Sequence, residues 1–553
     1  MSKKRLFSPA FIQRFTSVHS WVGICTGMAL FIAFFAGALA VYLEPIQKWA
    51  NPELRPAYGS AADIERVVEA AMQHPDFSGA FDLSFAADGR GPKVVFYGGN
   101  PSRGEPWVTH TLGLGADGNI ARIDVPSSVG AMINQIHYSL GLPKHAGYTL
   151  MGVVSAVYGL ALLTGLLIHL PHLLRDLYSF RVSKNLKKMW LDAHNVIGVL
   201  SLPFHLMFAF TGLLICIMPI LGNMMDQASP SLAASQAFAA QEQGGFVMRR
   251  HNQSKAGRNE SPPASMLTAS RLLEIATTEV EAFEPNGISY TGYATHDARA
   301  KVVGHVHRTL VSEASVVIAA STGDVIEVDT PGKRSVPTVL EGGYVFLHFA
   351  DFGGQFTRAI YFVLGLAGAF LFYSGNLLWI ETRRRHRHVE QPMSGWVMAQ
   401  LSVGICLGCC LGIGLMLLGT QLLPLGLPGR SQWEENLYYI GFFGTLIWSL
   451  ARPPIRVGIE ILAGCAALYG LLPVLNITLS SWHGAWDVAW FDAILLLLAV
   501  SFLALARSTM RRAATGQPNS VWSFSSRPRQ SIPPVARSSE CGSTAGCPPE
   551  SRR

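Results

Sequence analysis

Long apolar runs alternate with two long polar segments along this 553-residue chain. A run of about 18 or more apolar residues is typical of a helix that crosses the hydrocarbon core of a bilayer. The pattern predicts eight membrane spans, at residues 20–43, 147–170, 193–219, 357–381, 397–420, 437–451, 455–475 and 488–507. The chain is therefore expected to be an integral membrane protein, with an all-α bundle whose last four spans occupy residues 397–507.

The two polar segments, residues 44–146 and 220–356, each have the pattern of a folded unit. A stretch with helical periodicity is followed by stretches that alternate as strands do, and each unit contains a similar Gly- and Asp-containing turn. The helices are expected at 61–73 and 268–282, the strands at 93–97, 107–112, 301–307 and 314–319, and the turns at 115–120 and 321–326. Repetition of one plan predicts two related α+β modules.

Basic residues indicate how the spans are oriented. Clusters of Lys and Arg flank the runs at 3–14, 175–188, 383–387, 452–456 and 507–512, and all fall on one side if eight spans alternate. Because such clusters mark the cytoplasmic face, residues 44–146 and 220–356 are expected in the periplasm of a bacterium and both termini in the cytoplasm. The expected units are 1–43 (N-terminus and first span), 44–146, 147–219 (spans two and three), 220–356, 357–381 (span four), 397–507, and a disordered cytoplasmic tail at 508–553.

Composition narrows the class further. Hydrophobic residues make up 49% of the chain and charged residues only 14%, below the roughly 25% charged content of soluble domains. The net charge of +7 belongs to clusters beside apolar runs, which argues for the inner membrane and against nucleic acid as a partner. Neither polar segment contains cysteine, so neither has a disulfide framework.

Six of the 17 histidines lie at or near the first four apolar runs. Ionisable side chains are costly at membrane depth and are candidates for function there. The expected topology puts His19, His169 and His194 near the cytoplasmic face, His137 and His348 near the outer face, and His205 between them. Two layers of histidine predict ligands for two stacked cofactors.

Spacing adds detail to this prediction. His194 and His205 are expected on one stripe of a single helix, about 16 Å apart along its axis, so that one helix serves both layers. Glycines four residues after three of the histidines (Gly23, Gly141 and Gly198) are expected to leave room for a flat ring. Axial histidines hold haem iron in many proteins. Zinc is an alternative, although layered histidines without cysteine or carboxylate suit haem better, and isolated histidines at a membrane surface are often simply hydrogen-bonded.

The pairing follows from an up-and-down bundle, in which spans one and three are diagonal, as are two and four. His19 is expected to pair with His194, and His137 with His348. His205 could replace one of the outer pair, and His169 could replace His19. No CxxCH sequence occurs, so a c-type haem is not expected.

Several strings in the first two thirds resemble one known family. They are Val18-His19-Ser20-Trp21-Val22-Gly23, Phe35-Ala36-Gly37-Ala38-Leu39, Asn51-Pro52-Glu53-Leu54, Thr164-Gly165-Leu166-Leu167-Ile168-His169, Trp190-Leu191-Asp192-Ala193-His194 and Leu347-His348-Phe349-Ala350-Asp351. Together, over about residues 15–385, they resemble the PepSY-associated transmembrane family. The resemblance implies b-type haems between four helices, PepSY-like outer domains, and kinship with iron-uptake membrane proteins and ferrisiderophore reductases.

The expected function is electron transfer through two haems b across the inner membrane to ferric siderophore or ferric iron. The donor would be a quinol or a cytoplasmic reductase, and membrane lipid the surrounding partner. The expected enzyme is a ferric reductase-like oxidoreductase, for which no catalytic residue is predicted. Two alternatives stay open: a non-enzymatic PepSY-type protein that binds peptide or restrains a protease, and a transporter.

Overall fold

Helices dominate the structure, a computed structural model. It describes residues 8–51, 61–77, 79–85, 91–98, 108–114, 118–122, 127–170, 185–228, 264–306, 312–334, 336–350, 352–479 and 486–528. Within these residues, six helices are long and apolar enough to cross a membrane, or seven if one bent pair counts as a single span. The six are α1 (Pro9–Ala40), α5 (Lys144–His169), α12 (Gly354–Thr382), Met393–Leu422, α16 (Pro454–Leu479) and most of α17 (Trp486–Thr515). A multi-pass membrane protein is confirmed.

The bent pair corresponds to the third predicted span. Helix α7 (Leu186–Leu200) and helix α8 (Leu202–Ala228) meet at Ser201 with a bend of 71° over Leu186–Met218. Pro203 stands at the second position of α8, where a missing N–H and a fixed ring interrupt the regular hydrogen-bond ladder. The helix predicted over 193–219 is therefore broken at Ser201, although the bent pair can still count as one span.

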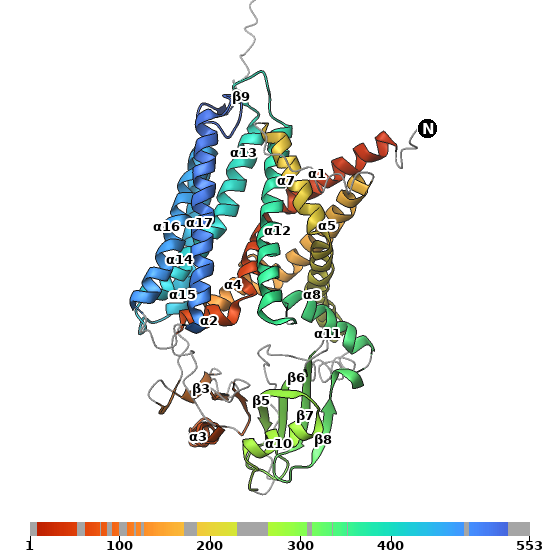
Figure 1. The fold of residues 1–553 in the computed structure, drawn as a ribbon, viewed down its shortest axis with the longest axis vertical. Coiled ribbons are helices and arrows are strands. Elements are labelled where there is room, and N and C mark those ends of the chain that lie inside the picture. The colour runs from red at the N-terminus through yellow and green to blue at the C-terminus, as the bar shows by residue number, and fades with distance from the viewer. Residues whose placement is uncertain are drawn as a thin grey trace, which may run out of the picture.

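Four of these elements form the first bundle. Helix α1 packs against both α5 and α12, α8 packs against α5, and α7 packs against α12. The broken helix α7–α8 thus lies diagonally opposite α1, and α5 lies diagonally opposite α12. The expected order of helices around the bundle is confirmed (Figure 1).

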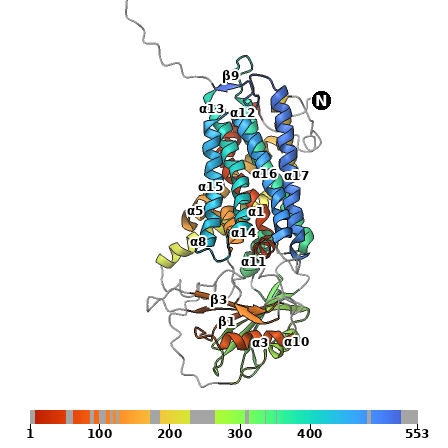
Figure 2. The same ribbon diagram turned by 90° about the vertical axis from the view of Figure 1, so that its left-hand side faces the viewer.

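The helices that follow α12 in the chain form a second bundle beside the first (Figures 1 and 2). It contains α13 (Met393–Ser402), a π-helical turn (Val403–Leu407), α14 (Gly408–Leu422), α15 (Arg430–Ala451), α16 and α17. Helix α15 includes the sixth predicted span, yet it begins with charged residues and is not among the candidate spans of the described chain. Eight spans are therefore not confirmed.

One antiparallel sheet of eight strands lies at one end of the bundles, and its order is β4-β3-β2-β1-β5-β6-β7-β8. The strands are β1 (Phe81–Ser84), β2 (Lys93–Gly98), β3 (Val108–Leu114), β4 (Ile120–Arg122), β5 (Phe283–Thr291), β6 (Arg299–Val306), β7 (Glu313–Ala319) and β8 (Val325–Asp329). The two predicted modules each supply four consecutive strands. They share this sheet because β1 pairs with β5, with Phe81 opposite Tyr290.

Each half of the sheet has one helix of its own, α3 (Ala61–Met72) or α10 (Ala269–Glu279). Both helices bury apolar residues in one core with the strands, including Val67, Phe96, Leu272 and Val316. In Figure 2 both helices lie below β1 and β3. The helix expected at 268–282 is confirmed but ends at Glu279, and the first half of the turn expected at 115–120, residues 115–117, lies outside the described residues.

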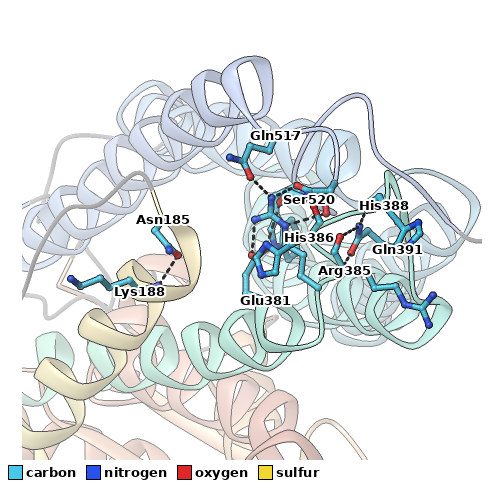
Figure 3. Close-up of polar contacts among 12 residues, drawn as sticks. Asn185, Lys188, Glu381, Arg385, His386, His388, Gln391, Gln517 and Ser520 are labelled. Carbon is cyan, nitrogen blue, oxygen red and sulfur yellow. Dashed lines mark hydrogen bonds and ion pairs between the residues drawn. The ribbon is translucent and has the colours of Figure 1, made fainter.

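Three short helices lie where the bundles meet the sheet: α2 (Leu43–Ala50), α4 (Val129–Ser139) and α11 (Val336–Phe349) (Figure 1). At the opposite end, β9 (Glu390–Gln391) pairs with β10 (Arg527–Pro528). The same end holds Glu381 of α12, which forms an ion pair of 3.3 Å with Arg384, and Arg384 donates to Gln517 over 2.8 Å (Figure 3). These contacts fasten the segment after α17 to the first bundle.

Candidate functional site: two histidine pairs

The first histidine pair lies in the half of the bundle farther from the sheet. His19 of α1 faces His194 of α7 across the diagonal of the bundle, with ring centroids 6.2 Å apart and ring planes at 73°. His19 Nδ1 lies 2.9 Å from the carbonyl oxygen of Ala161 on α5, and His194 Nδ1 lies 3.1 Å from that of Leu371 on α12. The two rings are thus each held by a helix other than their own.

The second pair lies near the sheet, on two of the short helices. His137 of α4 and His348 of α11 have ring centroids 5.9 Å apart and ring planes at 42°. His137 Nδ1 lies 2.7 Å from the carbonyl oxygen of Ala33 on α1, and His348 Nδ1 lies 2.8 Å from the hydroxyl of Thr211 on α8. Both predicted pairs are therefore found as ring neighbours.

Hydrogen-bond direction fixes the tautomer of these rings. A carbonyl oxygen only accepts, so Nδ1 of His19, His137 and His194 must carry the proton and donate it. Thr211 donates its hydroxyl hydrogen to the Met207 carbonyl over 2.8 Å, so its oxygen accepts from His348. In each neutral ring, Nε2 then keeps the lone pair that a metal ion needs.

Glycines on the accepting helices let the rings approach the backbone. A Cβ on Gly37 would lie 2.7 Å from His137 Nδ1, one on Gly165 would lie 3.1 Å from His19 Cε1, and one on Gly375 would lie 3.2 Å from His194 Cε1. Each glycine stands four residues after the carbonyl that accepts, at residues 33, 161 and 371. A side chain at that position would crowd the ring, so glycine keeps the carbonyl accessible.

The glycines expected from sequence spacing have other surroundings. Gly141 has φ of 76° and lies beyond the end of α4, where it reverses the chain, so it does not lie on the His137 helix as expected. The space beside Gly23 is open, and a Cβ on Gly198 would make an ordinary contact of 3.6 Å with Leu371. Residue spacing along one helix does not identify the glycines that contact the rings, because each of these glycines lies on a different helix from its histidine.

An apolar cavity lies at the second pair. Its lining includes Phe34, Gly37, Phe204, Phe208 and Tyr361, together with His137 and His348. Aromatic and aliphatic walls with two inward imidazoles suit a flat, largely apolar ligand that needs an axial nitrogen.

His205 belongs to neither pair. Its side chain is fully buried, its Nδ1 lies 2.6 Å from the Tyr158 hydroxyl, and its Nε2 has no hydrogen-bond partner among the described residues. Its nearest aromatic neighbour is Phe34, with ring centroids 5.5 Å apart. The bend between α7 and α8 removes the expected shared stripe with His194, and that prediction is wrong.

His169 is the last residue of α5, half-buried and close enough to interact electrostatically with His19 and His194. The rings of His19 and His194 contact each other, with centroids 6.2 Å apart. The ring geometry therefore favours His194 as the partner of His19.

The four paired histidines occupy matching places in two halves of the chain. Gly37 comes 18 residues after His19, and Gly212 comes 18 residues after His194, so the two helices carry histidine and glycine at the same spacing. His137 and His348 lie on the short helices before α5 and α12, and each of those helices then has a hydroxyl residue followed by glycine, Thr164-Gly165 or Ser374-Gly375. By the same register, His205 matches Leu30 and His169 matches Trp379. Among the six candidate histidines, only the four paired ones have a histidine at the matching position in the other half of the chain.

The spacing of each pair fits an iron between two imidazoles. Metal–nitrogen bonds to histidine are about 2.0–2.1 Å long, so two rings on opposite sides of one ion have centroids about 6 Å apart. The observed separations are 6.2 Å and 5.9 Å. With Nδ1 donating to the protein and an apolar cavity at the second pair, the donor set suits axial ligation of haem.

Comparison with known proteins concerns the same part of the chain. The family model described as the PepSY-associated TM region matches residues 16–382, from α1 to the end of α12. An uncharacterized protein of Pseudomonas aeruginosa is 26% identical over 371 residues, which is 62% of this chain and 89% of that protein. The family match contains all six candidate histidines and ends before the second bundle.

Proposed function

The chain belongs to the family of the PepSY-associated TM region, and on that premise we propose that it binds two b-type haems and transfers electrons across the membrane. One observation carries the proposal: four imidazoles form two pairs, each with centroids about 6 Å apart, and each ring has Nδ1 bonded to the protein. Axial ligands would be His19 with His194, and His137 with His348. His169 and His205 are the reserve ligands.

The chain's own residues would hold and tune these cofactors. Haem supplies a one-electron couple, whose potential depends on the axial ligands, the hydrogen bonds to them and burial. The acceptors at Nδ1, three carbonyls and the Thr211 hydroxyl, fix each ring and increase the basicity of Nε2. Phe34, Phe204 and Phe208 line the cavity at the second pair with apolar surface.

Direction and acceptor form the second part of the proposal. Basic residues at the end of the bundle away from the sheet, such as Arg383 and Arg511, support a cytoplasmic location for that end in a bacterial inner membrane. The sheet then lies in the periplasm, beside the pair His137–His348. The family resemblance supports a ferric siderophore or another ferric complex as the acceptor at this face, with a quinol or a cytoplasmic reductase as donor.

Visible spectroscopy tests the cofactor. The full-length protein, purified from haem-replete cells, is expected to show a six-coordinate low-spin b-type spectrum when oxidised and when reduced with dithionite. Extraction into alkaline pyridine should give two haems b per chain. Colourless protein would overturn the electron-transfer proposal and leave a PepSY-type binding protein as the better description.

Reoxidation tests the acceptor separately. Protein reduced with a limiting amount of dithionite under argon is expected to return to the oxidised spectrum on addition of a ferric siderophore, and the iron-free siderophore is the control. Haem that stays reduced after the ferric complex is added would exclude that acceptor while leaving the cofactor proposal standing.

A further inference from the structure

A second group of ligand-type side chains lies on the sheet, far in sequence from the bundle histidines. His74 and Asp76 follow helix α3, and His110 lies in the middle of β3. One ligand atom of each residue lies within 4.8 Å of the others, and this is the one such His, Cys, Asp or Glu group within the described chain. His110 Nε2 is 3.0 Å from Asp76 Oδ2, and the rings of His74 and His110 have centroids 4.4 Å apart.

His110 carries the first argument for a ligand. It is only 6% exposed, and within the described residues neither ring nitrogen has a hydrogen bond of acceptable geometry. Asp76 Oδ2 is close to Nε2 without forming a hydrogen bond with it. Buried polar atoms without partners are costly, and a cation between His110 Nε2 and Asp76 Oδ2 would give both atoms a partner.

Gly98 carries the second argument. A Cβ on this residue of β2 would lie 2.6 Å from Asp76 Cβ and 2.8 Å from His110 Nε2. Glycine inside a strand weakens the strand and often marks a place where another group approaches closely. Here the missing side chain leaves space at the point where the imidazole and the carboxylate meet.

We propose that His74, Asp76 and His110 bind a divalent first-row transition-metal ion such as Zn²⁺. Two imidazoles and one carboxylate are the ligand set of many zinc and iron sites, whereas Ca²⁺ and Mg²⁺ prefer oxygen ligands. With bonds of about 2.0–2.1 Å, tetrahedral ligand atoms lie about 3.4 Å apart. The separations of 3.0 Å (His110–Asp76) and 3.9 Å (His74–Asp76) lie on either side of that value.

The exposure of the three residues indicates an open site. The side chains of Asp76 and His74 are 47% and 29% exposed, so the ion would have a buried ligand on one side and solvent on the other. The Asp76 amide donates to His74 Nδ1 over 3.2 Å, which holds the imidazole beside the carboxylate, and an ion at Nδ1 would replace this long bond. Three protein ligands leave at least one position for water or another small ligand.

Zinc titration of the full-length protein tests this site independently of haem. After treatment with EDTA and its removal, calorimetric titration with Zn²⁺ should show one tight site that excess Mg²⁺ does not displace. Asp76→Asn and His110→Gln should weaken that site by at least about tenfold. Gly98→Ala should weaken it as well, because the methyl group occupies the space of the ion.

The matched control is His296→Ala. His296 also lies beside a carboxylate, with its Nδ1 3.9 Å from Asp297 Oδ1, but it is 72% exposed and belongs to no such three-residue group of described residues. This variant should bind zinc as the parent protein does. Asp76 is an exposed residue, so Asp76→Asn should fold normally, and its thermal unfolding in EDTA checks this. If Asp76→Asn and His110→Gln bind zinc like the parent, or if the parent binds none, the group is a simple ion pair and the proposal fails.

Discussion

Each paired imidazole has one nitrogen bonded to the protein, and that bond decides what the other nitrogen offers. The acceptors are the backbone carbonyls of residues 33, 161 and 371 and the Thr211 hydroxyl, so in all four rings Nδ1 carries the proton and Nε2 keeps its lone pair. A single buried histidine commonly has a hydrogen-bond partner for its N–H, so one such bond indicates little. Four histidines that share this arrangement and form two pairs support a common role as metal ligands.

Removing single histidines should affect one pair at a time. We expect His194→Ala and His348→Ala each to lose or convert one haem while the other keeps its spectrum, and the double variant to lose both. The physical reason is that each change removes one ligand and no helix. Pyridine haemochrome content and the reduced spectrum measure this, and His145→Ala, an exposed residue, is the control.

The pairing would be wrong if both single variants kept full haem content and unchanged spectra. Loss of haem only in His205→Ala and His169→Ala would keep two cofactors but assign them other ligands. The internal repeat argues against this second outcome, because neither residue has a histidine at the matching position.

A methyl group should be enough to disturb a pair. In Gly37→Ala the new Cβ would lie 2.7 Å from His137 Nδ1, so the ring must leave its carbonyl, and the second haem should be lost or become high-spin. Gly159→Ala on α5, where nothing lies within 4 Å, is the matched control and should keep the parent spectrum. A Gly37→Ala protein with the parent spectrum would show that this close approach is unimportant.

How far the sequence predicts this site depends on the kind of contact. Histidines near the ends of apolar runs can be recognised in a single sequence, and the order of the helices in the bundle then predicts how they pair. The glycines and hydroxyls that seat them do not stand out, because Gly37 and His137 meet only after the chain has returned through the sheet. The group His74–Asp76–His110 was missed for the same reason, since β3 brings His110 to a turn more than thirty residues earlier.

Among the elements, α4 carries His137 and contacts both bundles. Just before α4, the Ser127 hydroxyl donates to Glu434 Oε2 of α15 over 2.7 Å. Glu434 forms an ion pair of 2.9 Å with Arg430, and both side chains are almost completely buried, at 1% and 3% exposure. The second bundle therefore supports the position of the helix that holds a proposed ligand.

Breaking this buried ion pair should be costly. Arg430→Met would leave Glu434 buried without its partner, and we expect a loss of roughly 3–5 kcal/mol of stability. Arg452→Met is the control, because its pair with Glu460 is 32% and 41% exposed, and such pairs contribute about 0–1 kcal/mol. Unfolding of the detergent-solubilised proteins measures both, and equal losses would contradict the role given to Arg430.

The alternating pattern of the sequence predicts the strands correctly, whereas hydropathy alone does not predict where the long helices break or begin. The strands over 93–97 and 314–319 lie within β2 and β7. The region 193–219 is mostly apolar on both sides of Ser201, so hydropathy does not indicate the break there, although Pro203 is visible in the sequence. The run at 437–451 is a helix, but its charged first turns keep it out of the set of candidate spans.

On the scale of the whole molecule, the two halves of the family region repeat each other. Each half has a helix with one paired histidine, four strands with a helix, and a short helix with the other histidine. Each half then has a span whose carbonyl accepts from its own half's first paired ring. One imidazole of each pair comes from each half. Sequence comparison of the two polar segments suggested the repeat in the sheet, whereas its extension to the helices required the contacts.

Sidedness can be tested on described residues at the two ends. Ser265→Cys lies just before α10 on the sheet, and Ser508→Cys lies near the far end of α17. In a background without Cys541 and Cys547, an impermeant thiol reagent added to spheroplasts should label Ser265→Cys at once and Ser508→Cys only after lysis, because basic loops face the cytoplasm. The reverse pattern would overturn the orientation, and with it the periplasmic acceptor.

The seam between β1 and β5 limits how independent the two modules are. Each of these strands would be a sheet edge if its half stood alone, with a row of unpaired backbone groups open to association with other chains. The pairing Phe81 to Tyr290 and Leu83 to Ile288 covers both edges. Neither module can therefore be removed, exchanged or expressed by itself without exposing an unpaired strand that can associate with other chains.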